Sequence, residues 1–207
     1  MSEIKDIKPE PPDPEGSIYG PYRPELQATM QELADRITRI GTELQQEIGM
    51  DPIEHCVMRI KSEESMREKC RRRGFPETTE SALTLIHDAI GLRVVAAFVS
   101  DVYRIRDRIA AFEDCEVIYE KDYIRHAKPN GYRSLHLILR FQGKWYAEFQ
   151  LRTISMDTWA ALEHHMRYKK NLSGNTHLIE AELKRCADEL ASTDLSMQTI
   201  RDMILES

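Results

Sequence analysis

Two alternating runs of residues, separated by a short turn, constrain the fold of this chain most strongly. In residues 134–141 and 145–152 every second side chain is apolar, which is the period of a β-strand with one buried face. Pairing Phe141 with Trp145 buries all of these apolar side chains together and leaves Gln142-Gly143-Lys144 as the turn. The glycine of this turn is available for a left-handed conformation. We therefore predict an antiparallel hairpin with one apolar and one polar face.

The polar face of this hairpin is a candidate site. The predicted register places His136 opposite Gln150 and Ser134 opposite Arg152, with Glu148 beside an apolar residue of the other strand. A lone charged residue on a strand usually faces solvent. Here several polar and ionisable side chains share one face, so the arrangement indicates a functional strip.

The rest of the chain switches repeatedly between the helical period and the strand period. We expect strands at 53–60, 91–99 and 115–119. We expect helices from Leu26 to a stop at Gly49 and Pro52, from a Ser62 cap to Gly74, after a Ser100 cap, from Ser155 to about Lys170, and over 179–204, where the apolar spacing is interrupted at 192–196. This pattern predicts the α+β class, with a mixed, largely antiparallel β-sheet flanked by helices and with helices at both ends.

The composition limits the class of protein. The chain has 207 residues and no long apolar run, so we expect one catalytic domain and no membrane span. Six of its nine prolines fall in residues 1–24, for which we predict a flexible arm. This start does not resemble a secretory signal, so we expect a cytoplasmic protein. The four cysteines are scattered, which argues against disulfides and a zinc site.

The charge is distributed unevenly. The net charge of -6 disfavours general binding to nucleic acid. The stretch from Arg59 to Arg73, however, contains seven basic and three acidic residues. One concentrated cationic stretch in an acidic protein suits a small polyphosphate ligand.

Two carboxylates are candidates for a metal site. Asp88 stands where a helix gives way to a strand, a position that a turn residue would also explain. Glu148 belongs to the polar strip of the hairpin. Brought together from separate strand regions, these two side chains could hold one Mg²⁺, a cation that prefers oxygen ligands and shares its shell with substrate phosphates.

The turn at residues 128–134 is a candidate nucleotide site. A Pro-Asn-Gly turn is ordinary in any hairpin, but it does not explain why Tyr132 and Arg133 follow Lys128 so closely. An aromatic face beside a guanidinium suits a purine nucleotide, because it offers stacking and phosphate pairing.

Several of these stretches, taken in order, resemble the synthetase domain of the RelA/SpoT family. They are RIKSEESMREKCRRRG (59–74), DAIGLRVV (88–95), DYIRHAKPNGYRSLHLIL (122–139), EFQLRT (148–153) and MDTWAALEHHMRYK (156–169). The resemblance covers residues 26–200 and implies a nucleotidyltransferase-like synthetase fold over 25–175. The segment 176–207 is then a C-terminal helical segment and a possible oligomer interface. The length resembles that of the small, single-domain branch, so we expect no hydrolase activity.

The resemblance implies a reaction and a set of roles. The β,γ-pyrophosphate of ATP would move to the 3′-hydroxyl of GDP or GTP, with Asp88 and Glu148 binding Mg²⁺ and Glu148 taking the hydroxyl proton. Arg59 and Arg93 would sandwich the adenine. The ATP phosphates would be held by Lys61, Ser65, Lys69 and Arg72. The guanine nucleotide would contact Lys128, Tyr132, Arg133, His136, Gln150, Arg152, Asp157, His164 and Lys169, with Tyr132 stacking on guanine and Asp157 accepting from its N1–H.

Other readings of the same residues remain open. A toxic relative could pyrophosphorylate the 3′ ends of tRNA or act on another nucleotide, although the acidic net charge counts against tRNA. A catalytically silent nucleotide- or RNA-binding module is a second alternative. The resemblance also implies a homo-oligomer, with a tetramer favoured, and an allosteric site for the product (p)ppGpp.

Overall fold

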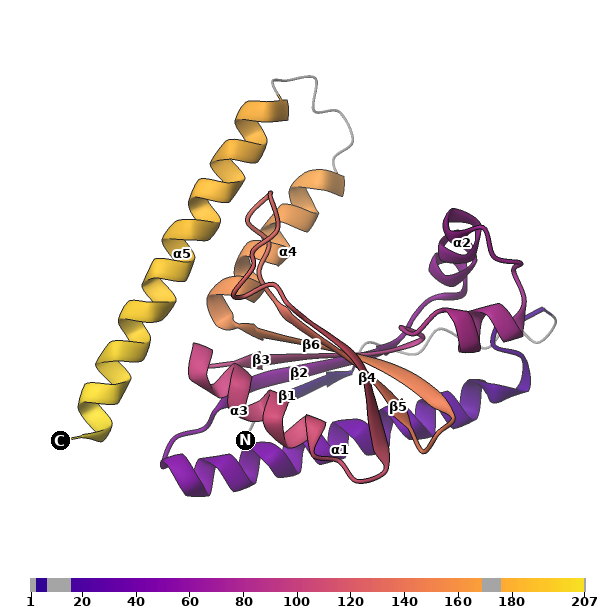
Figure 1. Cartoon of the computed structure of the whole chain (residues 1–207), viewed down its shortest axis with the longest axis horizontal. Helices are drawn as coiled ribbons and strands as arrows, with labels where there is room; N and C mark the ends of the chain where they lie inside the picture. The colour runs from indigo at the N-terminus through magenta and orange to yellow at the C-terminus, as the bar shows by residue number, and fades with distance from the viewer. Residues whose placement is uncertain (1–2, 7–15, 169–175, 207) are drawn as a thin grey trace.

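The computed structural model describes residues 3–6, 16–168 and 176–206 of the chain. Its centre is a six-stranded sheet in the order β1-β2-β3-β6-β5-β4 (Figure 1). The strands are β1 (Glu3–Asp6), β2 (Ile53–Ile60), β3 (Ile90–Ala96), β4 (Cys115–Asp122), β5 (Leu135–Phe141) and β6 (Trp145–Thr153). The pairs β1·β2 and β3·β6 are parallel and the other three are antiparallel. The predicted mixed, largely antiparallel sheet is confirmed.

The hairpin of β5 and β6 has the predicted register. Phe141 pairs with Trp145, His136 with Gln150, and Ile138 with Glu148. In the turn both Gln142 and Gly143 have positive φ, 49° and 66°, so the left-handed conformation extends to one residue that is not glycine.

The apolar face of the sheet is covered by two helices. These are α1 (Arg23–Ile48) and α3 (Val99–Ala110), which lie side by side beneath the strands (Figure 1). Leu26, Leu33, Ile37 and Leu44 of α1 are buried, as the helical spacing of apolar residues predicts. They form one core with the apolar side chains of the strands.

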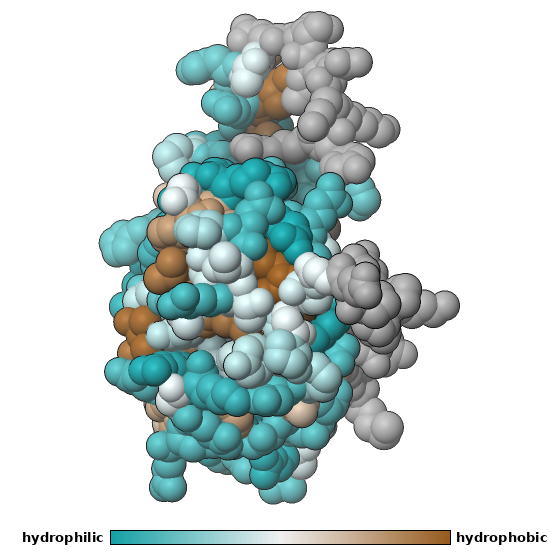
Figure 2. Space-filling view, turned by 90° about the vertical axis from the view of Figure 1, so that its right-hand side faces the viewer, coloured by the Kyte–Doolittle hydropathy of each residue, from teal (hydrophilic) through white to brown (hydrophobic). Residues whose placement is uncertain are grey.

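In the described part of the chain, the helices on the opposite face of the sheet lie at its two ends. The helix α2 (Glu63–Arg73) lies at one end, and α4 (Ile154–Tyr168) and α5 (Thr176–Leu205) lie at the other (Figure 1). Ser62 caps α2 by accepting a hydrogen bond from the Ser65 amide, and Gly74 ends it, as predicted. Seen from the α2 side, the surface is largely hydrophilic, with small hydrophobic areas between (Figure 2). Among the described residues no helix is both long and apolar enough to cross a bilayer.

The prediction of a flexible arm over residues 1–24 is wrong for residues 3–6 and 16–24. The first four form β1, a 3-10 helix η1 spans Gly20–Tyr22, and α1 begins at Arg23. The side chains of Ile18 and Tyr19 are buried in the core. Prolines stand in the first turns of η1 and α1, where no amide hydrogen bond is needed, so they begin helices here. Residues 7–15 lie outside the described part.

One further expectation about a helix is wrong. Ser100 does not cap α3, because the helix begins at Val99 with Phe98 as its cap, two residues earlier than expected, and β3 ends at Ala96. The C-terminal helix is confirmed: α5 continues through residues 192–196, where the apolar spacing is interrupted. Asp194 is buried there and accepts a hydrogen bond from the Thr153 hydroxyl.

Candidate functional site

A pocket on the polar face of the sheet brings together both predicted metal-binding carboxylates and three of the six predicted ATP-binding residues. It is formed by β2, β3, β6 and the residues that flank them, and it is lined by Arg59, Lys61, Asp88, Arg93, Glu148 and Gln150, with Val57, Gly91 and Leu92. Alternate residues of a strand share a face, and the pairing of β2 with β3 and of β3 with β6 places three such rows next to each other. Both predicted carboxylates therefore line one pocket.

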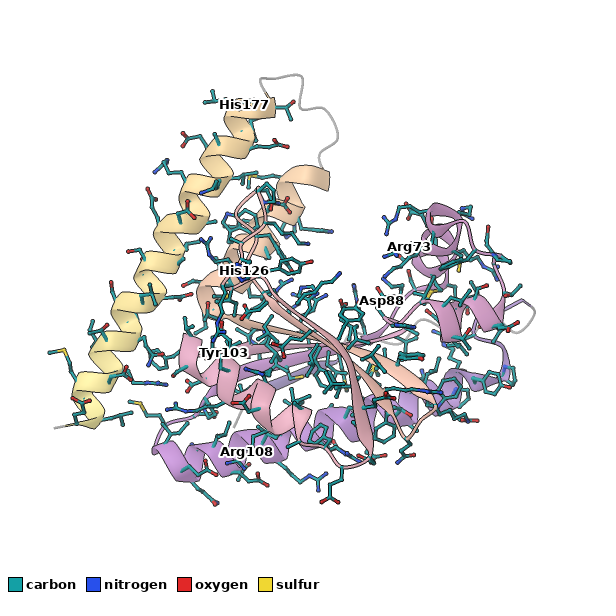
Figure 3. All side chains as sticks on the ribbon, in the orientation of Figure 1. Arg73, Asp88, Tyr103, Arg108, His126 and His177 are labelled. Atoms are coloured by element: carbon teal, nitrogen blue, oxygen red, sulfur yellow. The ribbon has the colours of Figure 1, made fainter. Side chains whose placement is uncertain are left out.

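Asp88 contacts two lysines and keeps one oxygen unpaired. Its Oδ2 lies 3.2 Å from Lys61 Nζ and also contacts Lys69 Nζ of α2. Its Oδ1 is buried and has no hydrogen-bond partner among the described residues. Figure 3 places Asp88 and Arg73 on the α2 side of the sheet, away from His126 near α4. A buried oxygen without a partner is costly, so this position fits a further donor or a cation.

Glu148 is held as a carboxylate by its neighbours. Its Oε1 lies 3.1 Å from His136 Nδ1, and its Oε2 accepts a hydrogen bond of 3.0 Å from Gln150 Nε2. Burial acts to raise the pKa of Glu148. The hydrogen bond and charge of His136, the bond from Gln150 and the charge of Lys69 outweigh burial and lower this pKa to about 2. Glu148 is therefore ionised at neutral pH.

A chain of hydrogen bonds leads from Glu148 to the start of α4. His136 Nε2 lies 2.9 Å from the Tyr132 hydroxyl, to which Arg152 Nη2 donates at 2.7 Å. Arg152 Nη1 donates to Asp157 Oδ1 at 2.9 Å, and Arg93 Nη1 donates to the same oxygen at 3.2 Å. Gln150 accepts from Arg152 Nη2 at 3.1 Å, so five of the residues predicted to bind the guanine nucleotide form one connected network, and Arg93 links it to the predicted ATP-binding residues of the pocket.

Tyr132 lies in a cluster of aromatic rings. The Tyr123 ring meets it edge-on with centroids 6.2 Å apart, and Lys128 Nζ lies 4.6 Å from the centroid of Tyr132. Sequence reasoning missed Tyr123, although it stands inside the stretch of residues 122–139. It also missed His55, whose Nε2 lies 4.0 Å from Asp157 Oδ2. No local motif marks His55, because only the pairing of β2 with β3 brings it near α4.

The N-terminal end of α2 is fixed by residues of the segment that we expected to be flexible. Glu63 Oε1 accepts from the Ser17 hydroxyl at 2.6 Å and from Arg23 Nη1 at 3.1 Å. The Tyr19 hydroxyl donates to the Lys61 carbonyl at 2.6 Å. The apolar pair at positions 18 and 19, between prolines, is the signal that could have indicated this contact.

Other predicted residues lie at the edge of the site or outside it. Ser65 and Arg72 are exposed on α2, and His164 is exposed on α4. Lys169 lies outside the described residues. Arg133 points away from the pocket and donates from Nη2 to Asp188 Oδ1 of α5 at 2.9 Å.

The chain is similar to known proteins over most of its length. A family model for the region found in RelA and SpoT proteins matches residues 58–173. Two relatives from Bacillus subtilis (strain 168) are the GTP pyrophosphokinases YwaC and YjbM. YwaC is 41% identical over 160 residues, covering 74% of this chain and 76% of the relative. YjbM is 31% identical over 195 residues, covering 90% and 88%.

The fold is similar to that of solved small alarmone synthetases. The small alarmone synthetase 2 from Bacillus subtilis superposes with a TM-score of 0.75 at 36% identity, covering 86% of this chain and 96% of that one. The small alarmone synthetase 1 from the same organism, bound to its product pppGpp, gives a TM-score of 0.76 at 28% identity, covering 88% and 95%. The expected resemblance is confirmed: the chain belongs to the RelA/SpoT family.

Proposed function

We propose that this protein transfers the β,γ-pyrophosphate of ATP to the 3′-hydroxyl of GDP or GTP, which gives ppGpp or pppGpp and AMP. The observation that carries the proposal is that Asp88 and Glu148 line one pocket between the cationic helix α2 and the network around Tyr132. The names of the relatives and the pppGpp bound to a similar structure support the same reaction.

The α2 side of the pocket is the proposed ATP site. Arg59 and Arg93 line the pocket from adjacent strands and would flank the adenine. Lys61, Ser65, Lys69 and Arg72 would hold the phosphates. Lys61 and Lys69 both contact Asp88 in the structure. The phosphate oxygens of bound ATP would be further negative partners for these two lysines.

The α4 side is the proposed acceptor site. Tyr132 would stack on guanine, with Lys128 beside its ring and Asp157 accepting from the guanine N1–H. His136, Gln150 and Arg152 would face the ribose and phosphates, and His164 and Lys169 would extend this side. Arg133 is left out of this site, because its guanidinium is paired with α5.

Mg²⁺ is the proposed cofactor, and the carboxylates fit it. Asp88 has a buried oxygen without a partner, and Glu148 is ionised. Among the described residues no group of three or more His, Cys, Asp or Glu side chains is arranged to hold a metal, so the two carboxylates would share the ion with substrate oxygens. When bound, the ion would neutralise charge on the transferred phosphates.

The protein's own residues position the reactants and spread charge. The 3′-oxygen attacks the β-phosphorus in line, a new P–O bond forms, the bond between that phosphorus and the α,β-bridging oxygen breaks, and AMP leaves. Glu148 accepts the hydrogen bond of the 3′-hydroxyl. With a pKa of about 2 it is a weak base, so it takes the proton only as the oxygen bonds to phosphorus and the hydroxyl becomes acidic.

We also propose that the protein forms a homo-oligomer, with a tetramer favoured. Exposed apolar side chains follow the C-terminal half of α5: Leu195, Met197, Ile200, Met203, Ile204 and Leu205. A large apolar helix surface of this kind marks an interaction site. Ile200→Asp should lower the mass measured by light scattering, and an unchanged mass would contradict this interface.

The experiment that tests the reaction uses purified protein, Mg²⁺, γ-labelled ATP and GMP, GDP or GTP in turn. We expect a labelled guanosine 3′-pyrophosphate and AMP. Glu148→Gln should lower kcat by at least ~100-fold. Glu189→Gln is the matched control, because Glu189 is exposed and pairs with Arg185 on its own helix. No product with any guanine nucleotide would contradict the proposal, and tRNA would then be tested as acceptor.

A further inference from the structure

The turn that carries Tyr132 lies directly against α5. Arg133 is the charged link: it donates from Nη1 to the Gly131 carbonyl at 3.2 Å and from Nη2 to Asp188 at 2.9 Å. Its side chain is only 18% exposed. One guanidinium therefore joins the backbone of the turn to the helix.

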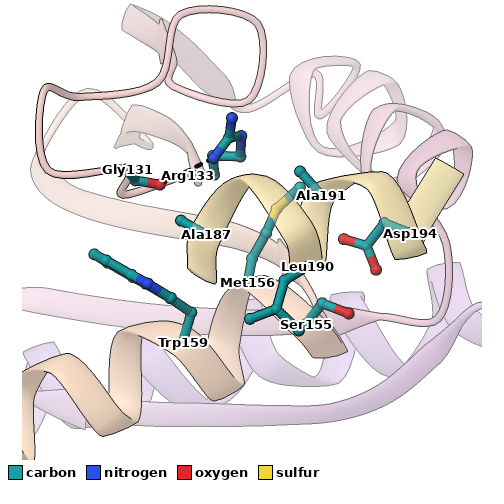
Figure 4. Close-up of a pocket in the computed structure, with 9 residues that line it drawn as sticks. All are labelled: Gly131, Arg133, Ser155, Met156, Trp159, Ala187, Leu190, Ala191 and Asp194. Atoms are coloured by element: carbon teal, nitrogen blue, oxygen red, sulfur yellow. Dashed lines mark hydrogen bonds between the residues drawn. The ribbon is translucent and has the colours of Figure 1, made fainter. Parts of the chain in front are cut away.

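The backbone of the turn also touches α5. Gly131 has φ +91°, and a Cβ added there would lie 2.6 Å from Ala187 Cβ and 3.0 Å from Lys184 Cα. Figure 4 shows Gly131, Arg133 and Ala187 together around a small cavity beside α5. Only glycine fits this approach, both because of the space and because of the positive φ.

The ring of Tyr132 has a second connection to α5. Trp159 meets this ring edge-on with centroids 6.5 Å apart, and its Nε1 donates to the Leu183 carbonyl of α5 at 2.9 Å. Within the turn, the Lys128 amide donates to the Tyr132 carbonyl at 3.1 Å. A shift of α5 would therefore move both the turn and the side chain that supports the ring.

We propose that Asp188 is a positioning residue for the acceptor site: through Arg133 it fixes the turn, so that Tyr132 is held in place to stack on guanine. The inference rests on the proposed function, in which Tyr132 binds the base. It assigns Arg133 a role different from contact with acceptor phosphates, and it makes α5 part of the acceptor site although none of the residues proposed to bind the nucleotide belongs to α5.

The first experiment is Asp188→Asn, which weakens the pairing with Arg133 and keeps the size of the side chain. We expect KM for the guanine acceptor to rise about tenfold, with kcat at saturation and KM for ATP changed less than about twofold. The rise should be the same for GDP and GTP, because Tyr132 contacts the base that they share. Asp188→Glu, which keeps a carboxylate, should recover most of the loss, and Glu189→Gln is the control on the same helix.

The opposite results would overturn the inference. If Arg133 binds acceptor phosphates directly, its release in Asp188→Asn leaves the acceptor KM unchanged or lowers it, or changes it differently for GDP and GTP. Hydrogen exchange separates this inference from the proposed reaction. Even if the wild-type protein makes no alarmone, amides of residues 128–136 should exchange faster in Asp188→Asn than in Glu189→Gln, and equal rates would exclude the positioning role.

A second pair of variants tests the backbone contact. Gly131→Ala should raise the acceptor KM more than Asp188→Asn does, because the new methyl group clashes with α5. Adding Ala187→Gly removes the shortest of these contacts and should recover part of the loss, with the rest due to the positive φ. An acceptor KM in Gly131→Ala equal to that of the wild type would contradict the contact.

Discussion

The two sides of the pocket are built differently. On the α2 side, Arg59, Ser65 and Arg72 are exposed, and Lys61 and Lys69 share one carboxylate oxygen of Asp88. On the α4 side the side chains are connected to one another by hydrogen bonds. Arg152, 7% exposed, donates to Ser134, Tyr132, Gln150 and Asp157. The donor side thus holds positive charge with few protein partners, whereas the acceptor side is already assembled.

The supports of the two sides explain this difference. The helix α2 is anchored at its N-terminal end through Glu63 and through the Lys61 carbonyl, while the cationic residues of its last turn are exposed. The acceptor side is built on the β5–β6 hairpin and braced by α5. Changes on the acceptor side should therefore cost stability as well as activity, and changes on the donor side should cost mainly activity.

The largest effect should come from Arg152→Met. This change removes a buried guanidinium and leaves several acceptors unpaired, so we expect the free energy of unfolding to fall by about 3 kcal/mol. Urea unfolding at pH 7 measures this. A loss below ~0.5 kcal/mol would show that the acceptor network does not stabilise the fold.

The next effect is a dependence of stability on pH. The pKa of Glu148 falls from its ordinary value of 4.5 to about 2 on folding, so its contribution is complete above pH 4.5 and is lost as the pH falls towards 2. We expect Glu148→Gln to be less stable than the wild type by about 2 kcal/mol at pH 7, and by less than half of that at pH 3. Urea unfolding at both pH values tests this, and a constant difference would contradict the ion pair with His136.

A smaller effect is expected at the anchor of α2. Glu63→Gln weakens the pairing with Arg23 and should raise KM for ATP about tenfold, or 1.4 kcal/mol, without changing KM for GDP. Glu64→Gln, at the adjacent exposed position, is the control. An equal rise in KM for ATP and KM for GDP would mean that Glu63 supports both the ATP side and the acceptor side of the pocket.

The smallest effect should come from Arg72→Lys. Arg72 is exposed at the end of α2, so the free energy of unfolding should change by less than about 0.5 kcal/mol. KM for ATP should rise a few-fold at most, since the charge is kept. A stability loss similar to that of Arg152→Met would remove the contrast between the two sides.

Local patterns were sufficient to predict the elements that carry the site. The alternation along β5 and β6 and their glycine-containing turn predicted the register that sets His136 opposite Gln150. The Ser62 cap and the Gly74 stop predicted the bounds of α2. Each of these features depends on residues close together in the chain, so it can be predicted without the tertiary structure.

Contacts between distant segments were not predicted in the same way. Ile18 and Tyr19 pack into the core, and Arg133 pairs with Asp188, 55 positions further along the chain. The same local sequence, an arginine beside a tyrosine, allows the arginine to pair either with a ligand or with a neighbouring helix.

The sequence by itself determined the strand and helix periods, the hairpin register, and the presence of two candidate carboxylates and of a cationic stretch. Tertiary structure alone decided which lysines meet Asp88, that Glu148 is held ionised beside His136, and that α5 supports the Tyr132 turn. The physical reason is that periodicity and turn chemistry are local, whereas the partner, burial and pKa of a side chain depend on which distant segments the fold places around it.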